Sequence, residues 1–372
     1  MNVLGVEMRD FRSYTRADAS LGAGLTVVHG PNGAGKSNLL EAVYYACTGR
    51  SPRTRNEREL VRFGAPACRV ATRLRDGADE HELTVGFASA APGSPAQKRM
   101  TADGAPVERL LDVAHRPLVS VFMPDRLELV KGPPAARRAH LDQLVAALWP
   151  VRAATRREYS RVLAQRNALL GRIRSGAAGD TTLAAWDREL AVQALALRAD
   201  RAAAVALVAA PFADRADRLG CTGSPSLEYR PRSQATDEEA FCAELRDRLA
   251  SDLERGFTTH GPHRDELAMV RGGRELRTYG SQGEQRLVLL ALLLAERSVL
   301  GEERGSTPLM LLDDVMSELD RDRRELLAGD LGSAGQSVIA TTDLGHVPGA
   351  SDAAVTRLRI APGAILGEAQ AA

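Results

Sequence analysis

Hydrophobic and polar residues alternate through much of the first hundred residues, with the period of half-buried β-strands. This alternation predicts strands at residues 3–8, 11–21, 24–30, 67–74 and 81–87. A polar break is expected at Arg9–Asp10, and turns are expected at Gly77 and across residues 88–95. Roughly the first 120 residues are therefore predicted to form a strand-rich lobe.

The pattern changes near Leu118. A strand is predicted to end at Pro124, and a helix is predicted to begin near Ala135. From there to about Leu219 the chain is rich in Ala, Arg and Leu, with expected breaks near Gly176–Asp180 and at Pro211. Two or three long helices are predicted, packed on one another as an inserted arm. The leucines do not keep a strict heptad, so no long coiled coil is expected.

Strand-forming patterns return from Leu227 onward. The expected elements are a hairpin turning at Gly272–Gly273, an apolar helix from about Glu284, a buried strand at Pro308–Asp314, a helix from about Asp322 and a strand at Ser337–Thr342. The last residues, from Gly367 to Ala372, are predicted to be disordered.

Composition restricts the class of protein. With 372 residues and 44% hydrophobic residues, two or three compact units with a substantial core are expected. The net charge of +1 provides no general case for a polyanionic partner. Four well-separated cysteines without a C-x-x-C pair indicate buried, reduced thiols. No apolar run reaches about 18 residues and no signal peptide is evident, so a soluble cytoplasmic protein is expected.

One glycine-rich stretch carries the clearest chemistry. Residues 30–37, GPNGAGKS, match the phosphate-loop pattern G-x-x-x-x-G-K-[ST], between a predicted strand and an amphipathic stretch at Asn38–Ala46. Glycines let backbone N–H groups close around a polyphosphate, and the helix adds its positive end. Lys36 is predicted to reach the β- and γ-phosphates and Ser37 to hold Mg²⁺. The predicted ATP contacts are Gly30, Pro31, Asn32, Gly33, Ala34, Gly35, Lys36, Ser37 and Asn38.

A chance glycine-rich turn is the alternative interpretation of this stretch. The chain has only three lysines, Lys36, Lys98 and Lys131, and its other basic residues are arginine, apart from histidine. A lysine retained in such a sequence indicates a site for a compact ammonium rather than a planar guanidinium. Nucleotide binding is therefore the favoured hypothesis.

An acidic strand supplies the expected second half of this site. PLMLLDD, residues 308–314, is a hydrophobic run that ends in two carboxylates, as at the ligand-binding edge of a parallel sheet. Asp313 is predicted to contact Mg²⁺, and Asp314 is predicted to orient the attacking water. A solvated turn after a core strand is the alternative.

Two further motifs flank the acidic strand in the sequence. SQGEQ, comprising Ser281, Gln282, Gly283, Glu284 and Gln285, precedes the acidic strand, and a turn from Ser317 to Asp320 follows it. This order resembles that of ABC-type ATPases, with their signature motif and D-loop. The resemblance implies that the signature serine, glycine N–H and helix dipole bind the γ-phosphate held by a second subunit.

Seven stretches together resemble the RecF family of SMC-like ATPases. They are DFRSY (10–14), GPNGAGKSNLLEAVYYACTGRSPRT (30–54), FMPDRLELVKGPPAARRAHLD (122–142), QRNALL (165–170), GPHRDEL (261–267), YGSQGEQR (279–286) and LLDDVMSELD (311–320). The resemblance implies an α/β fold: an ABC-type P-loop ATPase head with mixed sheets and an inserted helical lobe, without a long coiled coil. Residues 1–125 and 296–372 would form the ATPase lobe, and 126–295 the helical arm ending in the signature.

The same resemblance implies a function. It implies an ATP-dependent homodimer that binds DNA at single strands, duplexes or gap junctions, hydrolyses ATP slowly with Mg²⁺, and helps to load RecA with RecR and RecO.

The sequence departs from the ABC pattern at three points. Asp314 stands where the second carboxylate is usually Glu, no Gln occurs near Phe122–Asp125 as a Mg²⁺ sensor, and Thr342 or Asp343 replaces the switch histidine. His346 is expected at the surface.

Clusters of arginine indicate where DNA could bind. The candidates are Arg53, Arg55, Arg152, Arg156 and Arg161, and the last three are expected to share one helical face with Arg157. Few aromatic residues lie nearby, so contacts to phosphates are expected. The alternative for each cluster is a solvated surface in an arginine-rich chain.

Two other functions share the phosphate loop. An ATPase subunit that energises a membrane transporter would share the acidic strand as well, but it predicts the Gln sensor and the switch histidine. A small-molecule kinase leaves SQGEQ and the helical arm unexplained.

Overall fold

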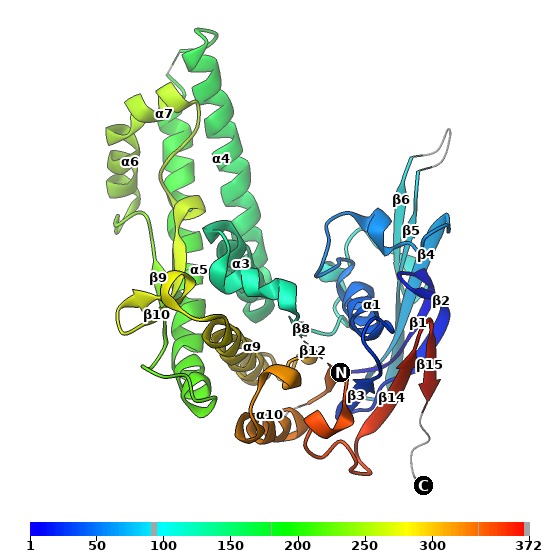
Figure 1. Ribbon diagram of the computed structural model, residues 1–372. Coiled ribbons are helices and arrows are strands. Elements are labelled where there is room, and N and C mark those ends of the chain that lie inside the picture. The colour runs from blue at the N-terminus through cyan, green and yellow to red at the C-terminus, as the bar shows by residue number, and fades with distance from the viewer. Residues whose placement is uncertain (91–94, 180, 334, 368–372) are drawn as a thin grey trace. The chain divides into compact units, whose positions relative to one another are not determined.

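The computed structural model describes residues 1–90, 95–179, 181–333 and 335–367 (Figure 1). The disorder predicted at the C-terminus falls on residues that, apart from Gly367, lie outside these ranges. The chain divides into two compact units. Unit 1 comprises Met1–Arg126, Arg218–Gly220 and Leu300–Ala372, and unit 2 comprises Leu127–Asp217 and Cys221–Val299.

An antiparallel sheet begins unit 1. Its strands lie in the order β2-β1-β4-β5-β6-β7. Their bounds are β1 Asn2–Phe11, β2 Tyr14–Ser20, β4 Ala67–Asp76, β5 Asp79–Ala88, β6 Gln97–Ala102 and β7 Ala105–Pro106. The break predicted at Arg9–Asp10 is wrong, because Arg9 pairs with Arg16 on one side and Arg69 on the other, and the strand continues to buried Phe11. Pairing on both edges keeps Arg9 in the sheet, whereas Asp10 has a positive φ of 47° within the strand.

A second, mostly parallel sheet holds the short hydrophobic strands of unit 1. Its order is β15-β14-β3-β13-β12-β8, and only β15 pairs antiparallel. The bounds are β3 Leu25–His29, β8 Val119–Phe122, β12 Leu309–Asp313, β13 Ser337–Thr341, β14 Thr356–Ala361 and β15 Ala364–Gly367. β12 and β13 are buried at every position, as strands of a parallel sheet covered on both faces are.

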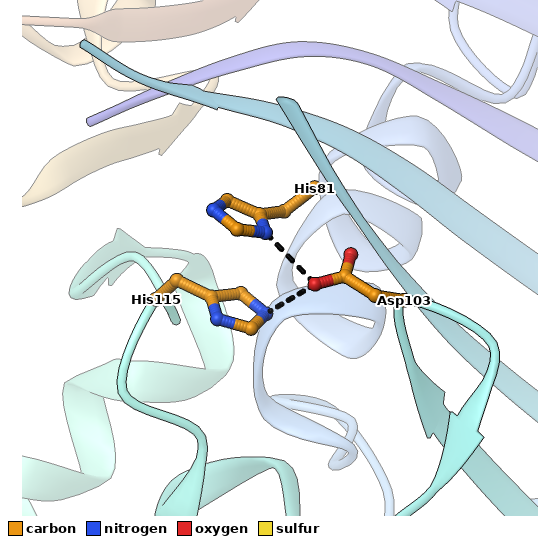
Figure 2. A group of neighbouring side chains, drawn as sticks. All are labelled: His81, Asp103 and His115. Atoms are coloured by element: carbon orange, nitrogen blue, oxygen red, sulfur yellow. Dashed lines mark hydrogen bonds and ion pairs between the residues drawn. The ribbon is translucent and has the colours of Figure 1, made fainter. Parts of the chain in front are cut away.

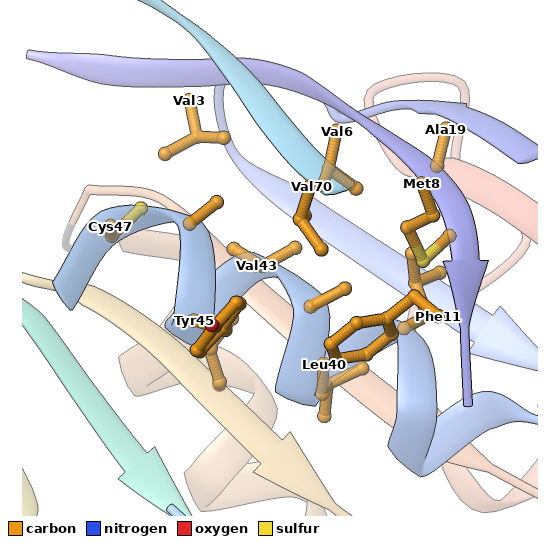
Figure 3. Close-up of a cluster of buried hydrophobic side chains, with 14 of the residues drawn as sticks. Val3, Val6, Met8, Phe11, Ala19, Leu40, Val43, Tyr45, Cys47 and Val70 are labelled. Carbon is orange, nitrogen blue, oxygen red and sulfur yellow. The ribbon is translucent and has the colours of Figure 1, made fainter. Parts of the chain in front are cut away.

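Helix α1, Lys36–Thr48, packs against both sheets of unit 1. One hydrophobic core joins Val3, Met8 and Val70 of the antiparallel sheet, Leu40 and Val43 of α1, and residues of the parallel strands. Figure 3 shows Leu40, Val43 and Tyr45 of the helix beneath the side chains of the antiparallel strands. The phosphate-loop helix is therefore fixed by hydrophobic burial on two sides. Unit 1 also contains η1 Glu57–Leu60, η2 Leu110–Asp112, η6 Met316–Glu318, α10 Arg321–Ser333 and η7 Leu344–His346.

Unit 2 is mainly helical. Its helices include α2 Glu128–Lys131, α3 Pro134–Leu148, η4 Pro150–Arg152, α4 Ala153–Arg174, α5 Leu183–Arg218, α6 Glu238–Asp247, α7 Leu249–Arg255, η5 Pro262–Arg264 and α8 Leu276–Tyr279. α9, Gln282–Arg304, begins in this unit and ends in unit 1, and η3, Pro124–Leu127, leads from unit 1 into unit 2. A three-stranded sheet has the order β11-β10-β9, with bounds β9 Ser226–Arg230, β10 Glu266–Arg271 and β11 Arg274–Glu275.

The helical arm differs from the sequence prediction at Pro211. This proline lies inside α5 instead of ending it. Buried Val208 and Phe212 flank it, so packing holds the helix through the position where one backbone hydrogen bond is lost. Helices α6 and α7 were not predicted from the sequence. The predicted turn at Gly272–Gly273 is present, and both glycines have positive φ.

A buried arginine ties the helices of unit 2 together. Arg166 of α4 is 0% exposed and donates to Asp187 of α5 at 2.7 Å, to Asp252 of α7 at 2.9 Å and to Thr258 Oγ1 at 2.7 Å. A buried charge of this kind requires such partners, because leaving one unpaired is strongly destabilising. The QRNALL stretch thus has a structural role in positioning α4, α5 and α7.

Candidate nucleotide-binding site

The loop between β3 and α1 needs glycine for steric reasons. Gly30 has φ of 152°, and a Cβ there would lie 2.2 Å from the carbonyl oxygen of Ile360. Gly35 has φ of 118°, and its Cβ would lie 2.8 Å from the Tyr14 hydroxyl. Gly33, at φ 76°, has open space where a side chain would be. The loop therefore follows a path that other residues adopt only with strain, and it leaves room above Gly33.

Lys36 points back over this loop. Its ammonium donates to the carbonyl oxygens of Gly30 at 2.9 Å and Pro31 at 3.0 Å. Burial lowers the pKa of Lys36 below its ordinary value, and the nearby carboxylates of Asp314 and Asp313 oppose that shift. No side chain caps the N-terminus of α1 at Gly35, so the N–H groups of its first turn remain available to an anion.

The acidic strand lies close to the loop helix. β12 is separated from β3 in the sheet only by β13, and Asp313 is its last residue. The Ser37 hydroxyl lies close to the Asp313 carboxyl. Burial raises the pKa of the Asp313 carboxyl, the neighbouring Ser37 hydroxyl opposes this shift, and the charge of Asp314 adds to it.

Asp314 has an unusual environment. Its backbone lies in the left-handed region at φ 51°, and its N–H donates to the carbonyl oxygen of Ala340 at 3.0 Å. Its Oδ1 is buried and has no hydrogen-bond partner among the described residues. A buried carboxylate oxygen without a donor fits a site that is completed by a bound group.

These residues fit a magnesium nucleotide. A serine hydroxyl beside a carboxylate supplies the oxygen ligands that Mg²⁺ prefers. The glycine loop, the ammonium and the open helix N-terminus supply donors for phosphate oxygens. Gly30, Lys36, Ser37, Asp313 and Asp314 are thus brought together as the sequence predicted, although their roles remain a proposal.

Polar residues that support the loop include four to which the sequence assigned no role, Arg12, Ser13, Tyr14 and Glu41. Glu41 of α1 is 0% exposed and accepts from Arg12 at 2.7 and 2.9 Å and from Arg53 at 3.1 Å. Asn38 donates to Ser13 Oγ at 2.9 Å, and Tyr14 donates to the Gly35 carbonyl oxygen at 3.0 Å. DFRSY carried the family resemblance, but nothing local in it indicates that it supports the loop.

The two residues of the predicted D-loop, Ser317 and Asp320, make different kinds of contact. Ser317 is exposed, and its hydroxyl donates to the Asp314 carbonyl oxygen at 2.8 Å. Asp320 accepts from the Arg323 N–H at 3.0 Å at the start of α10, which is an N-cap contact. Ser317 is therefore joined directly to the acidic turn, whereas Asp320 has a local structural role.

The SQGEQ motif forms the start of α9 in unit 2. Ser281 Oγ accepts from the Glu284 N–H at 3.3 Å, and Glu284 accepts from the Ser281 N–H at 2.8 Å, which is a capping box. Gln285 is buried and donates to the Leu276 and Gly280 carbonyl oxygens at 3.0 and 3.2 Å. Ser281, Gln282 and Gly283 are exposed. The motif is therefore anchored at the buried Gln285, whereas its first three residues are exposed to solvent.

The predicted single cationic face on the arm is wrong. Arg152 lies in η4, before α4 begins. At about 100° per residue, Arg161 lies roughly 140° around the helix from Arg156. Arg152, Arg156 and Arg161 also pair with Asp200, Asp142 and Glu158 at 3.1, 2.8 and 2.8 Å. Arg55 and Arg157 are exposed and have no ion-pair partner in the described part of the chain.

The residues at the expected switch position make local contacts. Asp343 accepts from the Gly345 N–H at 2.8 Å, and His346 is half-buried in η7. Cys242 is partly exposed, whereas Cys47, Cys68 and Cys221 are buried as predicted, and none of the four forms a disulfide. Among the described residues, no helix has the length and apolar character needed to cross a membrane.

Comparison with known proteins shows a full-length relationship. Residues 3–358 match the family described as RecF/RecN/SMC N terminal domain. The DNA replication and repair protein RecF of Myxococcus xanthus is 38% identical over 94% of this chain and 93% of its own length.

Solved structures agree with this relationship. A structure of the recombination mediator protein RecF with ATP, from the RecFOR pathway, has a TM-score of 0.85, 26% identity and coverage of 99% of this chain and 97% of that one. An Smc head bound to the C-winged helix domain of ScpA shares the fold, with a TM-score of 0.60, 16% identity and coverage of 100% and 98%. The predicted ABC-type α/β fold without a long coiled coil is confirmed, and the chain belongs to the RecF family.

Proposed function

We propose that this protein is an ATP-gated DNA clamp of recombinational repair and replication restart. ATP would close a homodimer on DNA, the protein would help to load RecA at gaps together with RecR and RecO, and slow hydrolysis would reset it. The observation that carries this proposal is the meeting of Lys36, Ser37, Asp313 and Asp314 at one edge of a parallel sheet. Relatives named DNA replication and repair protein support the DNA-repair context.

Each residue of the site then has a definite task. The loop N–H groups and the Lys36 ammonium hold the phosphates, and Ser37 and Asp313 hold the cation. Bound Mg²⁺ would neutralise phosphate charge during transfer to water. Asp314 would position the attacking water. Its Oδ1 has no hydrogen-bond partner among the described residues and could accept a hydrogen bond from that water. A carboxylate one methylene shorter than Glu would hold that water less closely, which fits slow hydrolysis.

The dimer is proposed because the exposed start of the signature helix could bind an anionic group of a second subunit. Ser281, Gln282 and Gly283 face outward at the N-terminus of a 23-residue helix. In the proposed head-to-tail dimer, these residues would contact the γ-phosphate in the partner's loop. Glu284 and Gln285 would keep the turn in shape from behind.

Ser281→Arg tests the dimer directly. The long cation at the exposed turn is expected to block ATP-induced dimerisation, whereas ATP binding to the isolated subunit stays unchanged. Sedimentation velocity with and without ATP measures the assembly, and equilibrium titration measures nucleotide affinity. Ser175→Arg places the same side chain at an exposed position at the end of α4 and is the matched control. A wild-type protein that stays monomeric at saturating ATP and micromolar concentration would refute the clamp.

DNA contact is proposed through arginine and phosphate. Arg53, Arg55, Arg152, Arg156 and Arg161 remain the candidates, although only Arg55 among them has no acidic partner. An arginine that is already paired with a carboxylate can still bind phosphate. To do so, it must either contact both groups at once or break its ion pair with the carboxylate. Binding should therefore be salt-dependent and weak in sequence preference.

The triple variant Arg152→Ala, Arg156→Ala, Arg161→Ala tests the arm. Loss of three phosphate contacts would make the slope of log affinity against log salt shallower by about 2.7 on duplex DNA. Binding is measured across a salt series on single-stranded, duplex and gapped DNA. Arg321→Ala, which removes an 89% exposed arginine paired to Glu325, is the control. An unchanged slope in the triple variant would mean that these three arginines do not contact DNA and form only a solvated surface.

A transporter-energising subunit is the weaker alternative. The repair proteins among the relatives favour the clamp, and the sequence has neither the Gln sensor nor the switch histidine. Indifference to DNA together with co-purification of a membrane protein would reverse this preference.

A further inference from the structure

Three side chains from separate parts of unit 1 meet in a small cluster. His81 lies on β5, Asp103 lies in the turn between β6 and β7, and His115 lies on the segment that leads into β8. Figure 2 shows both imidazole rings directed at the Asp103 carboxylate. His81 Nδ1 lies 2.8 Å from Asp103 Oδ2, and His115 Nε2 lies 3.4 Å from the same oxygen. All three groups offer a ligand atom within 4.8 Å of the others.

The cluster is not satisfied by its own hydrogen bonds. His115 Nε2 is buried and has no hydrogen-bond partner among the described residues, since its contact with Asp103 lacks hydrogen-bond geometry. The two rings are stacked, with centroids 3.9 Å apart and planes 12° apart. Two stacked imidazoles would repel each other if both were protonated. A divalent cation bound by the ring nitrogens and the carboxylate would give the buried His115 Nε2 a partner.

The carboxylate is already held in the orientation of a metal ligand. Asp103 Oδ1 accepts from the Glu82 backbone N–H at 2.8 Å, which leaves Oδ2 directed at the imidazoles. Hydrogen bonds of this kind orient ligating carboxylates in metal sites. Zn²⁺ binds imidazole nitrogen and carboxylate oxygen at about 2.0–2.2 Å, so its tetrahedral ligands lie roughly 3.4 Å apart. Two of the distances between ligand atoms, 2.8 and 3.4 Å, are already near or below this spacing, and rotation of the two stacked rings would aim both nitrogens at one ion.

We propose that His81, Asp103 and His115 bind a divalent transition-metal ion of the Zn²⁺ class, with water in the fourth position. Two imidazoles and one carboxylate form a ligand set of intermediate softness that suits Zn²⁺. The same set does not suit Mg²⁺ or Ca²⁺, because these ions prefer oxygen ligands only. The site is distinct in residues and in metal preference from the proposed nucleotide site.

The metal would act as a staple within unit 1. Its ligands join β5 and the β6–β7 turn of the antiparallel sheet to the connection that enters β8, the edge strand of the parallel sheet. A ligand that binds the folded state stabilises it in proportion to its occupancy. The expected consequence is a more stable unit 1, whether or not nucleotide is bound.

The experiment uses the full chain without a polyhistidine tag, stripped of metal and titrated with ZnCl₂ alone. We expect one Zn²⁺ per chain after dialysis, measured by elemental analysis. We also expect a rise of roughly 5 °C in the unfolding midpoint at Zn²⁺ about 100-fold above its dissociation constant. Co²⁺ should give the visible absorption bands of a tetrahedral site with nitrogen and oxygen ligands.

Variants decide which residues hold the ion. His115→Ala and Asp103→Asn should each weaken Zn²⁺ binding by about 100-fold or more, because each removes a direct ligand, and even supporting residues cost about 10- to 100-fold. His346→Gln and Asp322→Asn remove an imidazole and an exposed carboxylate elsewhere in unit 1 and should retain the ion. Absence of stoichiometric binding at micromolar Zn²⁺, or equal binding by His115→Ala and the wild type, would overturn the proposal. Either result would leave the proposed clamp untouched, since ATP and DNA binding are measured separately.

Discussion

Lys36→Ala is expected to weaken ATP binding by about two to three orders of magnitude and to abolish ATP-dependent dimerisation. The Lys36 ammonium is held over the loop by the carbonyl oxygens of Gly30 and Pro31. It is therefore positioned before any phosphate arrives, and binding does not need to order a long side chain. Two charge-assisted hydrogen bonds to phosphate, at about 1.5–3 kcal/mol each, would account for about two to four orders of magnitude, and the expected loss lies in the lower part of that range because the Gly30 and Pro31 carbonyl oxygens compete for the ammonium.

The test is a titration of each variant with ATP, followed by sedimentation at saturating nucleotide. Lys131→Ala removes an exposed lysine from unit 2 and should behave as the wild type. Circular dichroism and thermal unfolding show whether the variant still folds, because Lys36 is buried beside two carboxylates. Wild-type ATP affinity in a folded Lys36→Ala protein would mean that the loop does not bind triphosphate in the proposed way.

Asp314→Asn is expected to separate ATP binding from hydrolysis. The variant should still bind ATP and dimerise, whereas turnover should fall by about 10²- to 10⁴-fold, the range for losing a group that positions or accepts a proton from the reacting water. Asparagine suits this position because it tolerates the left-handed backbone at φ 51°. The change thus removes the negative charge with little effect on the turn.

Single-turnover hydrolysis by preformed dimers measures this effect without interference from assembly. Asp314→Glu retains the carboxylate and should retain measurable turnover. Asp322→Asn, at an exposed position of α10, controls for the loss of one negative charge. Unchanged hydrolysis by Asp314→Asn would assign the water to another residue, and loss of ATP binding would indicate that Asp314 holds the nucleotide instead.

The two predictions address different steps of one cycle. Lys36→Ala should prevent the clamp from closing, and Asp314→Asn should prevent it from opening. DNA complexes of Asp314→Asn are therefore expected to outlast those of the wild type in the presence of ATP.

Most elements near the candidate site could be predicted from sequence because they depend on local patterns. The phosphate loop was evident from its glycine and lysine spacing, and β12 from a hydrophobic run ending in two aspartates. The start of α9 followed from its apolar run, and the Ser281 and Glu284 spacing of its capping box is equally local. Each signal lies within about ten residues, where propensity and periodicity act.

Other features depend on partners distant in the chain. Pro211 continues a helix because buried neighbours on either side pack, and Arg9 stays in a strand because both edges of β1 are paired. Which arginines are free was also decided in three dimensions, since Arg156 meets Asp142 from another helix.

The amino-acid sequence by itself determined the family, the loop, the acidic strand and the signature turn, because each is written in contiguous residues. Only the tertiary structure decided that Ser37 lies beside Asp313, that Asp314 has a buried oxygen without a partner among the described residues, and that His81, Asp103 and His115 meet. The physical reason is that sheet order and side-chain packing join segments far apart in the chain, and no local pattern encodes which segments those are.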